Sequence, residues 1–427
     1  MRKMRDSGIA WIGVIPQDWE IVRTKSLYCS AKEIAGDRAD DFERLALTLN
    51  GVIKRSKEDS VGLQPEKFSG YQILKKGELV FKLIDLENVA TSRVGLSPYT
   101  GIVSPAYIVL SKQSRAKDLV VRYSMYHFLS MWQREVFNQM GDNGVRSSLN
   151  AKELLNIPHP FPSIYEQKRI VTFLDAQCAE IDAVLEKTRA SIEEYKKLKQ
   201  AVITQAVTKG IRGDRPMKDS GIEWIGDIPA EWRKTQLRHC AAIKSGITLG
   251  KKYEKTDSLV ERPYLRVANV QDGYVDLSVL TTIEVTQDED LKYRLRAGDV
   301  LMTEGGDRDK LGRGCVWHGE IEPCLHQNHI FAVQTSKDTL LPEFLEYLTV
   351  SDVGRSYFDV TAIKTTNLAC TSSSKVLAFT IPLPSVEEQA EIVEALNTKC
   401  AGIDALVAKK QQYLTEIENY KKSLIYE

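Results

Sequence analysis

The chain has 427 residues, of which 43% are hydrophobic and 27% are charged, and its 58 Lys and Arg side chains balance its 58 Asp and Glu side chains. This length predicts two to four domains, because single hydrophobic cores stop growing beyond about 250 residues. No apolar run reaches the roughly 18 residues of a membrane helix, and the first residues lack the apolar stretch of a secretory signal, so we expect a cytoplasmic protein without a membrane span.

The neutral charge balance gives no support to nucleic-acid binding by itself. Residues 20–160 hold 20 basic and 16 acidic side chains, and residues 233–383 hold 19 basic and 20 acidic ones. Attraction to phosphates needs clustered Lys and Arg. A DNA-binding role would therefore require a partner that supplies much of this attraction.

The cysteines contain no Cys-x-x-Cys pair, which argues against a disulfide framework or a zinc ribbon. The seven are Cys29, Cys178, Cys240, Cys315, Cys324, Cys370 and Cys400. A zinc ion could be held by the group that falls within 15 residues, which is Cys315, His318, Cys324, His326 and His329. The spacing of this group is irregular, and strand alternation would turn His329 away from Cys324 and His326. We therefore expect buried thiols and polar histidines rather than a metal site.

The first element along the chain is a frame motif that occurs twice. Residues 6–19 recur as residues 219–232, with 10 of 14 positions identical. Such a match indicates an internal duplication. The repeated tryptophans Trp11, Trp19, Trp224 and Trp232 could stack on bases, but their place in the shared frame favours a packing role.

Two unlike stretches follow the two frames, at about residues 20–161 and 233–383. Short apolar runs with turn signals, and helical stretches near 119–139 and 341–350, predict a compact α+β domain in each. The turn and strand at 76–80 parallel those at 297–301. We infer one fold that carries two different surfaces.

A second pair of matching segments, 162–174 with 384–396 and 178–183 with 400–405, begins two long helices. Apolar or small residues recur there at alternating spacings of three and four, which is typical of a coiled coil. The seam is predicted to contain Leu174, Cys178, Ile181, Leu185, Ile192, Leu396, Cys400, Ile403, Val407 and Ile417, with Lys410 interrupting the second series. A helix over 164–208 would be about 65 Å long at roughly 1.5 Å per residue, so its seam must meet the second copy.

The fold class expected is α+β, with two globular domains joined by a pair of long antiparallel coiled-coil helices in pseudo-two-fold symmetry. We place the first domain with its frame at 1–162, the central helix and linker at 163–212, the second domain with its frame at 213–383 and the distal helix at 384–427. Half-sites on one face of duplex DNA recur about every 34 Å, so two similar domains on a stiff rod suit this ligand.

Several of these features together resemble the specificity subunit of type I restriction-modification systems. They are the Trp-Ile-Gly-x-Ile-Pro-x-x-Trp frame, the Pro-Ser-x-x-Glu-Gln helix starts at 162–167 and 384–389, the Ile-Asp-Ala segments, and the tandem frame around unlike inserts. Segments 264–270 and 298–313 also resemble a target-recognition domain of that family. The resemblance spans essentially the whole chain.

The resemblance implies a DNA-binding subunit without a catalytic centre, in which each insert is a target-recognition domain that reads half of a bipartite, asymmetric site. It also implies two modification subunits, docked on the helices, that bind S-adenosylmethionine and methylate adenine. Restriction subunits that use ATP and magnesium would join them. No cofactor is expected on this chain.

Base readout needs exposed Arg, Lys, Asn, Gln or hydroxyl side chains on loops. The candidates in the second insert are Arg308, Lys310, Arg313, Gln327, Asn328, His329, Lys364, Thr365, Thr366 and Asn367. Those in the first insert are Asn50, Lys54, Arg55, Lys82, Asn88, Arg93, Ser97, Arg146 and Ser147. Each could instead be a solvated residue of a turn.

Two other classes of protein stay open. A stand-alone DNA enzyme would need a site that the sequence does not reveal, because the methyltransferase motifs and a P-loop are absent and the nuclease-like pair Glu194 and Lys196 lies in a predicted coiled coil. A coiled-coil scaffold that joins two protein-binding modules is the other alternative.

Overall fold

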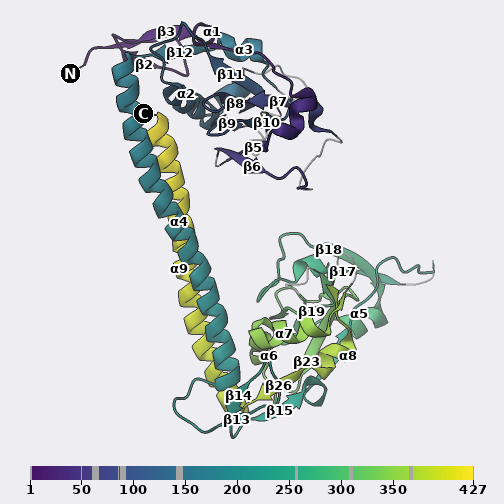
Figure 1. The fold of residues 1–427 in the computed structure, drawn as a ribbon. Helices are drawn as coiled ribbons and strands as arrows, with labels where there is room; N and C mark the ends of the chain where they lie inside the picture. Colours follow the sequence, from purple (N-terminus) through teal and green to yellow (C-terminus); the bar gives the residue numbers. More distant parts are fainter. Residues whose placement is uncertain are drawn as a thin grey trace. The chain divides into compact units, whose positions relative to one another are not determined.

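The chain divides into two compact units. Unit 1 combines Met1–Thr188 with Gln412–Glu427, and unit 2 is Arg189–Gln411. The computed structural model describes residues 2–49, 51–59, 67–84, 86, 93–140, 148–254, 258–306, 311–364 and 369–426, without the side chain of Lys364. Each unit holds one frame, one insert and a segment of both long helices (Figure 1). The four segments predicted from the sequence remain a prediction, since this division follows packing and cuts both helices.

The repeated frame has the same strands in both units. In unit 1, β1 (Met4–Asp6) and β2 (Val14–Pro16) form a hairpin, and β3 (Glu20–Arg23) pairs with β12 (Pro158–Phe161). In unit 2, β13 (Met217–Asp219) and β14 (Asp227–Pro229) form the hairpin, and β15 (Arg233–Gln236) pairs with β26 (Thr380–Leu383). The two ends of each insert are therefore hydrogen-bonded to each other just before a long helix begins.

The insert of unit 1 is built on a four-stranded antiparallel sheet. The helix that follows β11 in the chain packs on this sheet. In sheet order the strands are β4 (Tyr28–Cys29), β11 (Ile108–Lys112), β8 (Leu79–Lys82) and β9 (Arg93–Leu96). A second sheet contains β6 (Gly51–Arg55), β5 (Arg44–Thr48), β10 (Gly101–Val103) and β7 (Gln72–Leu74), and the helices are α1 (Thr24–Leu27), α2 (Val121–Gln133) and α3 (Ala151–Asn156). Phe81 of β8 and Phe128 of α2 are fully buried and meet edge to face, with ring centroids 5.1 Å apart.

The insert of unit 2 contains an antiparallel sheet with the same strand order. Its strands are β16 (Ala241–Ser245), β23 (Ile330–Thr335), β19 (Val300–Thr303) and β21 (Gly314–Val316). Two smaller sheets contain β18 (Thr281–Thr286), β17 (Leu259–Leu265) and β22 (Leu325–His326), and β20 (Gly305–Gly306), β25 (Ala369–Cys370) and β24 (Ile363–Lys364). The helices are α5 (Gln287–Tyr293), α6 (Pro342–Val350), α7 (Asp352–Thr361) and α8 (Ser373–Ala378). The α+β class expected of both inserts is confirmed, and the unlike sequences share one central sheet.

The two long helices, α4 (Ile164–Lys209) and α9 (Val386–Tyr426), run antiparallel within each unit (Figure 1). In unit 1, Asp182 forms an ion pair with Lys421 at 2.6 Å. In unit 2, Lys199 forms an ion pair with Asp404 at 2.7 Å. Between these two contacts the number rises by 17 along α4, from 182 to 199, and falls by 17 along α9, from 421 to 404. One register therefore holds in both units.

The residues expected along the helix seam differ in burial. Those of α4 are all buried, at 4 to 9% exposure, and so are Leu396 and Cys400 of α9. Ile403, Val407 and Ile417 of α9 are half-buried. Lys410, which interrupts the seam, lies 5.6 Å above the ring of Tyr195.

Candidate nucleic-acid interface

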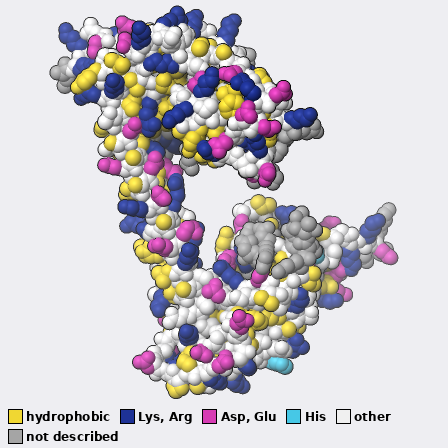
Figure 2. Space-filling model, viewed as in Figure 1, with side chains coloured by type: hydrophobic (Ala, Val, Ile, Leu, Met, Phe, Trp, Pro, Cys, Tyr) yellow, Lys and Arg dark blue, Asp and Glu magenta, His cyan; other side chains and the backbone are white. Residues whose placement is uncertain are grey.

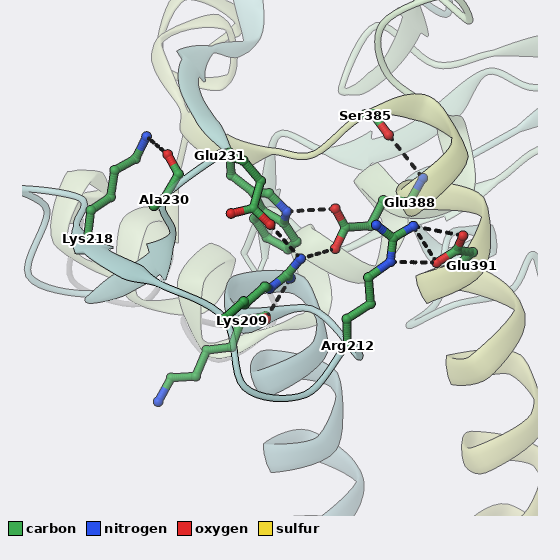
Figure 3. A network of polar contacts seen from close by, with 10 residues as sticks. Lys209, Arg212, Lys218, Ala230, Glu231, Ser385, Glu388 and Glu391 are labelled. Atoms are coloured by element: carbon green, nitrogen blue, oxygen red, sulfur yellow. Dashed lines mark hydrogen bonds and ion pairs between the residues drawn. The ribbon is translucent and has the colours of Figure 1, made fainter.

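A polar network joins each frame to the start of a long helix. In unit 2, the buried carboxylate of Glu388 accepts hydrogen bonds from the Trp232 indole at 2.9 Å and from Arg215 at 2.5 Å (Figure 3). In unit 1, Glu166 accepts from Trp19 at 3.0 Å and from Arg2. These tryptophans therefore pack the frame against the helix, which favours the packing interpretation over base stacking.

The neighbouring glutamine holds the insert in the same way in both units. Gln167 accepts from the backbone N–H of Val120 at 2.9 Å, and its amide donates to two backbone carbonyls. Gln389 accepts from the backbone N–H of Leu341 at 2.8 Å and donates to two carbonyls likewise. The Glu-Gln pairs thus orient each insert on its helix.

In unit 2, described residues that border three polar runs of the sequence lie close together. Gly305 pairs with Cys370 and Gly306 with Ala369, while Lys364 pairs with Ala369 from the other side. The ends of β20 at Gly306 and of β24 at Lys364 therefore lie on either side of β25. His329 joins this group, because its ring lies 2.5 Å from the Glu304 carboxylate.

In unit 1, the two polar runs of the insert also meet. Ile84 forms a bridge with Ser148, and Leu149 donates its backbone N–H to Leu83 at 3.0 Å. In unit 2, Thr371 donates to Glu304 in the same pattern, at 2.7 Å. In unit 1, β8 ends and β9 begins beside Ser148, and in unit 2, β19 ends and β21 begins beside Thr371. We call these two places the strand-end surfaces of units 1 and 2.

An arginine occupies the matching position of each strand-end surface. Arg93 directly precedes Val94, which pairs with Phe81 of β8. Arg313 directly precedes Gly314, which pairs with Met302, the residue of β19 that matches Phe81. Arg93 also faces Lys82 across β8 and β9, and its guanidinium lies 5.9 Å above the Trp132 ring, where burial lowers its pKa.

Gly312, which directly precedes Arg313, lies where a side chain would not fit. A Cβ there would lie 2.2 Å from the Phe358 ring, and its φ is +73°. Gly312 therefore lets the backbone pass a buried ring of α7, so its smallness serves packing.

Other candidates of the first insert form ion pairs on the hairpin of β5 and β6 or are buried. Lys54 pairs with Glu43 at 2.5 Å, and Arg55 pairs with Asp59 at 2.6 Å, both from the β5 and β6 hairpin. Ser97 is only 1% exposed, because its hydroxyl donates to the carbonyl of Tyr99 in a turn. The expectation that Ser97 is an exposed reading residue is therefore wrong.

Gln327 and Asn328 are half-buried and His329 is exposed. Gln327 accepts from the backbone N–H of Val267, so its carbonyl oxygen already has a partner. The remaining candidates lie outside the described residues, and these are Asn50, Asn88, Arg146, Ser147, Arg308, Lys310, Thr365, Thr366 and Asn367. The side chain of Lys364 is also outside them.

The cysteines and histidines near residue 320 do not gather as metal ligands. Across the described ranges, no three His, Cys, Asp or Glu side chains are grouped for a metal ion. Cys315, Cys324 and His326 are buried, and burial raises the pKa of each thiol to about 12 and lowers that of His326 to about 4. His329 lies in the turn between β22 and β23, not on a strand with Cys324 and His326, and its ring contacts Glu304.

The surface charges are mixed in sign. On the face shown in Figure 2, Lys and Arg side chains are interspersed with Asp and Glu in both units. Sequence reasoning missed Glu304 and Trp132, which contact His329 and Arg93. The one sequence signal for a role of Glu304 is its place directly before the paired glycines.

In the described part of the chain, no helix is long and apolar enough to cross a membrane.

No protein-family model matches the chain. It is 25% identical over 424 residues to the type I restriction enzyme MjaVIII specificity subunit of Methanocaldococcus jannaschii, covering 96% of this chain and 92% of that protein. It is 26% identical over 283 residues to the type I restriction enzyme EcoKI specificity subunit of Escherichia coli K12, covering 64% of this chain and 56% of that one. A solved structure, described as the structural basis of complex assembly and conformational transition of the type I R-M system, has a similar fold. Its TM-score is 0.68 at 16% identity, covering 96% of this chain and 97% of that one.

The fold and the matched strand-end surfaces define a tandemly repeated protein with two α+β units and one pair of long helices. Its listed sequence relatives are all specificity subunits of type I restriction enzymes, and the similarity to one of them extends over 96% of the chain. The chain is therefore similar in sequence to type I restriction enzyme specificity subunits.

Proposed function

We propose that the chain gives a type I restriction-modification complex its DNA specificity, and that each unit reads one half of a bipartite, asymmetric DNA site through its strand-end surface. The observation that carries this proposal is the matching position of Arg93 and Arg313 in two inserts with unlike sequences. One scaffold with different surrounding side chains is what reading two different half-sites requires.

The chemistry of these surfaces suits base recognition. Arginine paired to guanine is the commonest specific contact in the major groove, and lysine serves the same acceptors. In unit 1 the described candidates are Arg93 and Lys82, and in unit 2 they are Arg313, Asn328 and His329. The candidates in 85–92, 141–147, 307–310 and 365–368 lie outside the described residues, and they belong to the proposal because they are adjacent in sequence to the strands of these surfaces.

The proposal includes partners because the charge of the inserts is close to balanced. Residues 20–160 carry 20 basic and 16 acidic side chains, too small an excess to neutralise many phosphates. We assign the remaining phosphate contacts to two modification subunits, which would bind S-adenosylmethionine and methylate adenine. Restriction subunits with ATP and magnesium would complete a cytoplasmic assembly.

The experiment that tests this function is selection of duplexes from a random-sequence library by the complex assembled on this chain. A bipartite site supports the proposal. Failure to select any sequence favours the scaffold alternative, and turnover of DNA by the purified chain alone favours the enzyme alternative.

A further inference from the structure

The strand-end surface of unit 2 carries a glutamate and a histidine in direct contact. The ring Nδ1 of His329 lies 2.5 Å from the carboxylate of Glu304. Glu304 directly follows β19 and His329 directly precedes β23, the two central strands of the sheet. The backbones of the two residues are joined as well, because the N–H of Glu304 donates to the carbonyl of His329 at 2.9 Å.

The backbone of Glu304 is held on its other side by Thr371. The N–H of Thr371 donates to the carbonyl of Glu304 at 2.7 Å, so both backbone polar groups of Glu304 are hydrogen-bonded. The preceding residue, Thr303, pairs with Ile330 in the sheet. Side chains on such anchored backbone keep a more precise geometry than those on free loops. Glu304 is therefore a fixed support for the ring of His329.

Unit 1 has a different chemistry at the matching positions. The register of the two central sheets matches Glu304 with Leu83 and His329 with Ala106. Leu83 is 1% exposed, and the side chain of Ala106 is a methyl group. The shared scaffold thus carries a polar pair in unit 2 where it carries two apolar residues in unit 1. Such a difference is what two inserts that read different bases require.

The contact fixes which ring nitrogen of His329 carries the hydrogen. An ionised carboxylate has lone pairs but no hydrogen to donate, so it only accepts. Nδ1 of His329 must therefore donate to Glu304. A neutral imidazole has one N–H group, so the other nitrogen, Nε2, is left as a hydrogen-bond acceptor.

The ring is accessible at the surface while it keeps this contact. The side chain of His329 is 53% exposed and that of Glu304 is 33% exposed. Among the residues that the structure describes, none forms a hydrogen bond with Nε2 of His329. Arg313 of the same strand-end surface can only donate, because a guanidinium has no acceptor. His329 therefore adds a directed acceptor to this surface.

The major groove of DNA limits what such an acceptor can recognise. The ring N7 atoms of purines, O6 of guanine and O4 of thymine are acceptors, and the hydrogen-bond donors are the exocyclic amino groups of adenine and cytosine. We infer that Nε2 of His329 accepts a hydrogen bond from one of these amino groups, and that Glu304 is the positioning residue that keeps Nε2 an acceptor. The inference deepens the proposed function and rests on it.

The test begins with selection of duplexes from a random-sequence library by the assembled complex at pH 8.5, where imidazole is neutral. His329→Ala should broaden one base pair of one half-site and leave the other half-site unchanged, which also shows that the variant is folded. The selected pair shows whether the amino group belongs to adenine or to cytosine. His318→Ala is the matched control, because His318 is exposed and follows the end of β21 that is opposite to the strand-end surface.

The base pair found in this way is then synthesised with two kinds of base analogue. Purine or 2-pyrimidinone lacks the exocyclic amino group of adenine or cytosine, and a 7-deazapurine lacks the N7 acceptor. For each analogue, the loss of affinity in the unsubstituted complex is divided by the loss in His329→Ala, which isolates the contact of the ring. This ratio should be about five- to tenfold for the analogue without the amino group and about one for the 7-deazapurine.

Glu304→Gln tests the positioning role. A glutamine amide can accept from Nδ1 or donate to it, so both forms of the ring become possible. The ratio for the amino group should fall to about two, and the ratio for N7 should rise above one. A merely structural role of Glu304 would weaken binding of all duplexes alike and leave the ratios unchanged, which would overturn its assignment.

The outcomes separate this inference from the proposed function. A bipartite site that His329→Ala does not broaden would overturn the inference alone, and so would a ratio that is large for N7 and about one for the amino group. Failure of the complex to select any sequence would overturn the proposed function and the inference together.

Discussion

Trp232 donates its indole N–H to the carboxylate of Glu388 over 2.9 Å, and Trp19 makes the same contact with Glu166 over 3.0 Å. The tryptophans come from one pair of repeated motifs and the glutamates from the other pair, 147 and 156 residues away along the chain. The two repeats that appear separate in the sequence are therefore two halves of one joint between frame and helix.

This joint predicts a large effect of Glu388→Ala. Glu388 is 4% exposed, and the Arg215 side chain paired with it is 11% exposed. Removing the Glu388 carboxylate leaves the buried Trp232 indole without its acceptor and takes one of two carboxylates from Arg215, which keeps its ion pair with Glu231. Unfolding of unit 2 should therefore become easier by about 2 to 3 kcal/mol. Denaturant unfolding measures this change.

The control for that prediction is Glu391→Ala. Its ion pair with Arg212 leaves the two side chains 48% and 53% exposed, and exposed pairs contribute about 1 kcal/mol or less. Equal effects of the two substitutions would show that burial of the joint does not matter.

A pair of buried histidines predicts a pH dependence of unit 1. His159 is 0% exposed, its ring lies 2.9 Å from the Ser124 hydroxyl, and burial lowers its pKa to about 4. The neighbouring His127 ring is 4.6 Å away, and burial lowers its pKa also. Below pH 6.5 the unfolded chain binds protons that the folded unit does not, so stability should fall as pH drops from 6.5 to 4.

Thermal unfolding across this pH range checks the prediction. For His159 alone the loss should be about 3 kcal/mol, and His159→Asn should flatten the pH profile. Replacement of the exposed His239 by Asn should leave the profile unchanged. A profile that is flat in the unsubstituted chain would contradict the assignment of neutral buried histidines.

Glu346 predicts the opposite pH dependence in unit 2. Burial, followed by repulsion from Glu343, raises its pKa to about 7. Above pH 4.5 the unfolded chain ionises this carboxyl before the folded unit does, so its contribution to stability is lost as pH rises from 4.5 to 7. Glu346→Gln should therefore stabilise unit 2 by about 1 to 2 kcal/mol at pH 8 and change little at pH 4. Stabilisation equal at both pH values would refute the raised pKa.

Gly312→Ala should destabilise unit 2. The added Cβ would lie 2.2 Å from the Phe358 ring, and the backbone φ of +73° disfavours any side chain. Gly250→Ala is the matched control, because its φ is +81° but nothing lies within 4 Å of the added atom. Calorimetry should show a loss of about 1 kcal/mol for the control, and a loss at least 2 kcal/mol greater for Gly312→Ala. Equal losses would mean that the Phe358 contact does not constrain the loop.

The frame, the long helices and the α+β class could be predicted because their signals are local. The repeated sequence of residues 6–19 and 219–232 indicated the frame. The alternating spacing of three and four residues that includes Leu174, Cys178 and Leu185 indicated a buried seam. Each such signal lies within a few helical turns of sequence.

The meeting of distant polar runs could not be predicted. Gly305 pairs with Cys370, and Ile84 with Ser148, each across about 65 residues, and strand pairing over that separation leaves no periodic trace. The burial of Ser97 was missed for a related reason. The sequence does not distinguish a serine hydroxyl that donates a hydrogen bond to the backbone of its own turn from one that faces solvent.

The central claim, that each unit reads its own half-site, is tested most directly by the selection from random duplexes, repeated with Arg93→Ala and Arg313→Ala. The unsubstituted complex should select two specific half-sites at a constant interval. Each substitution should cost about 1 to 3 kcal/mol and broaden one half-site only, a different one in each case. Arg122→Ala, which removes an ion pair of α2 with Asp175, should leave the selected sequence unchanged. A single continuous motif, or broadening of both half-sites by either arginine substitution, would contradict the account.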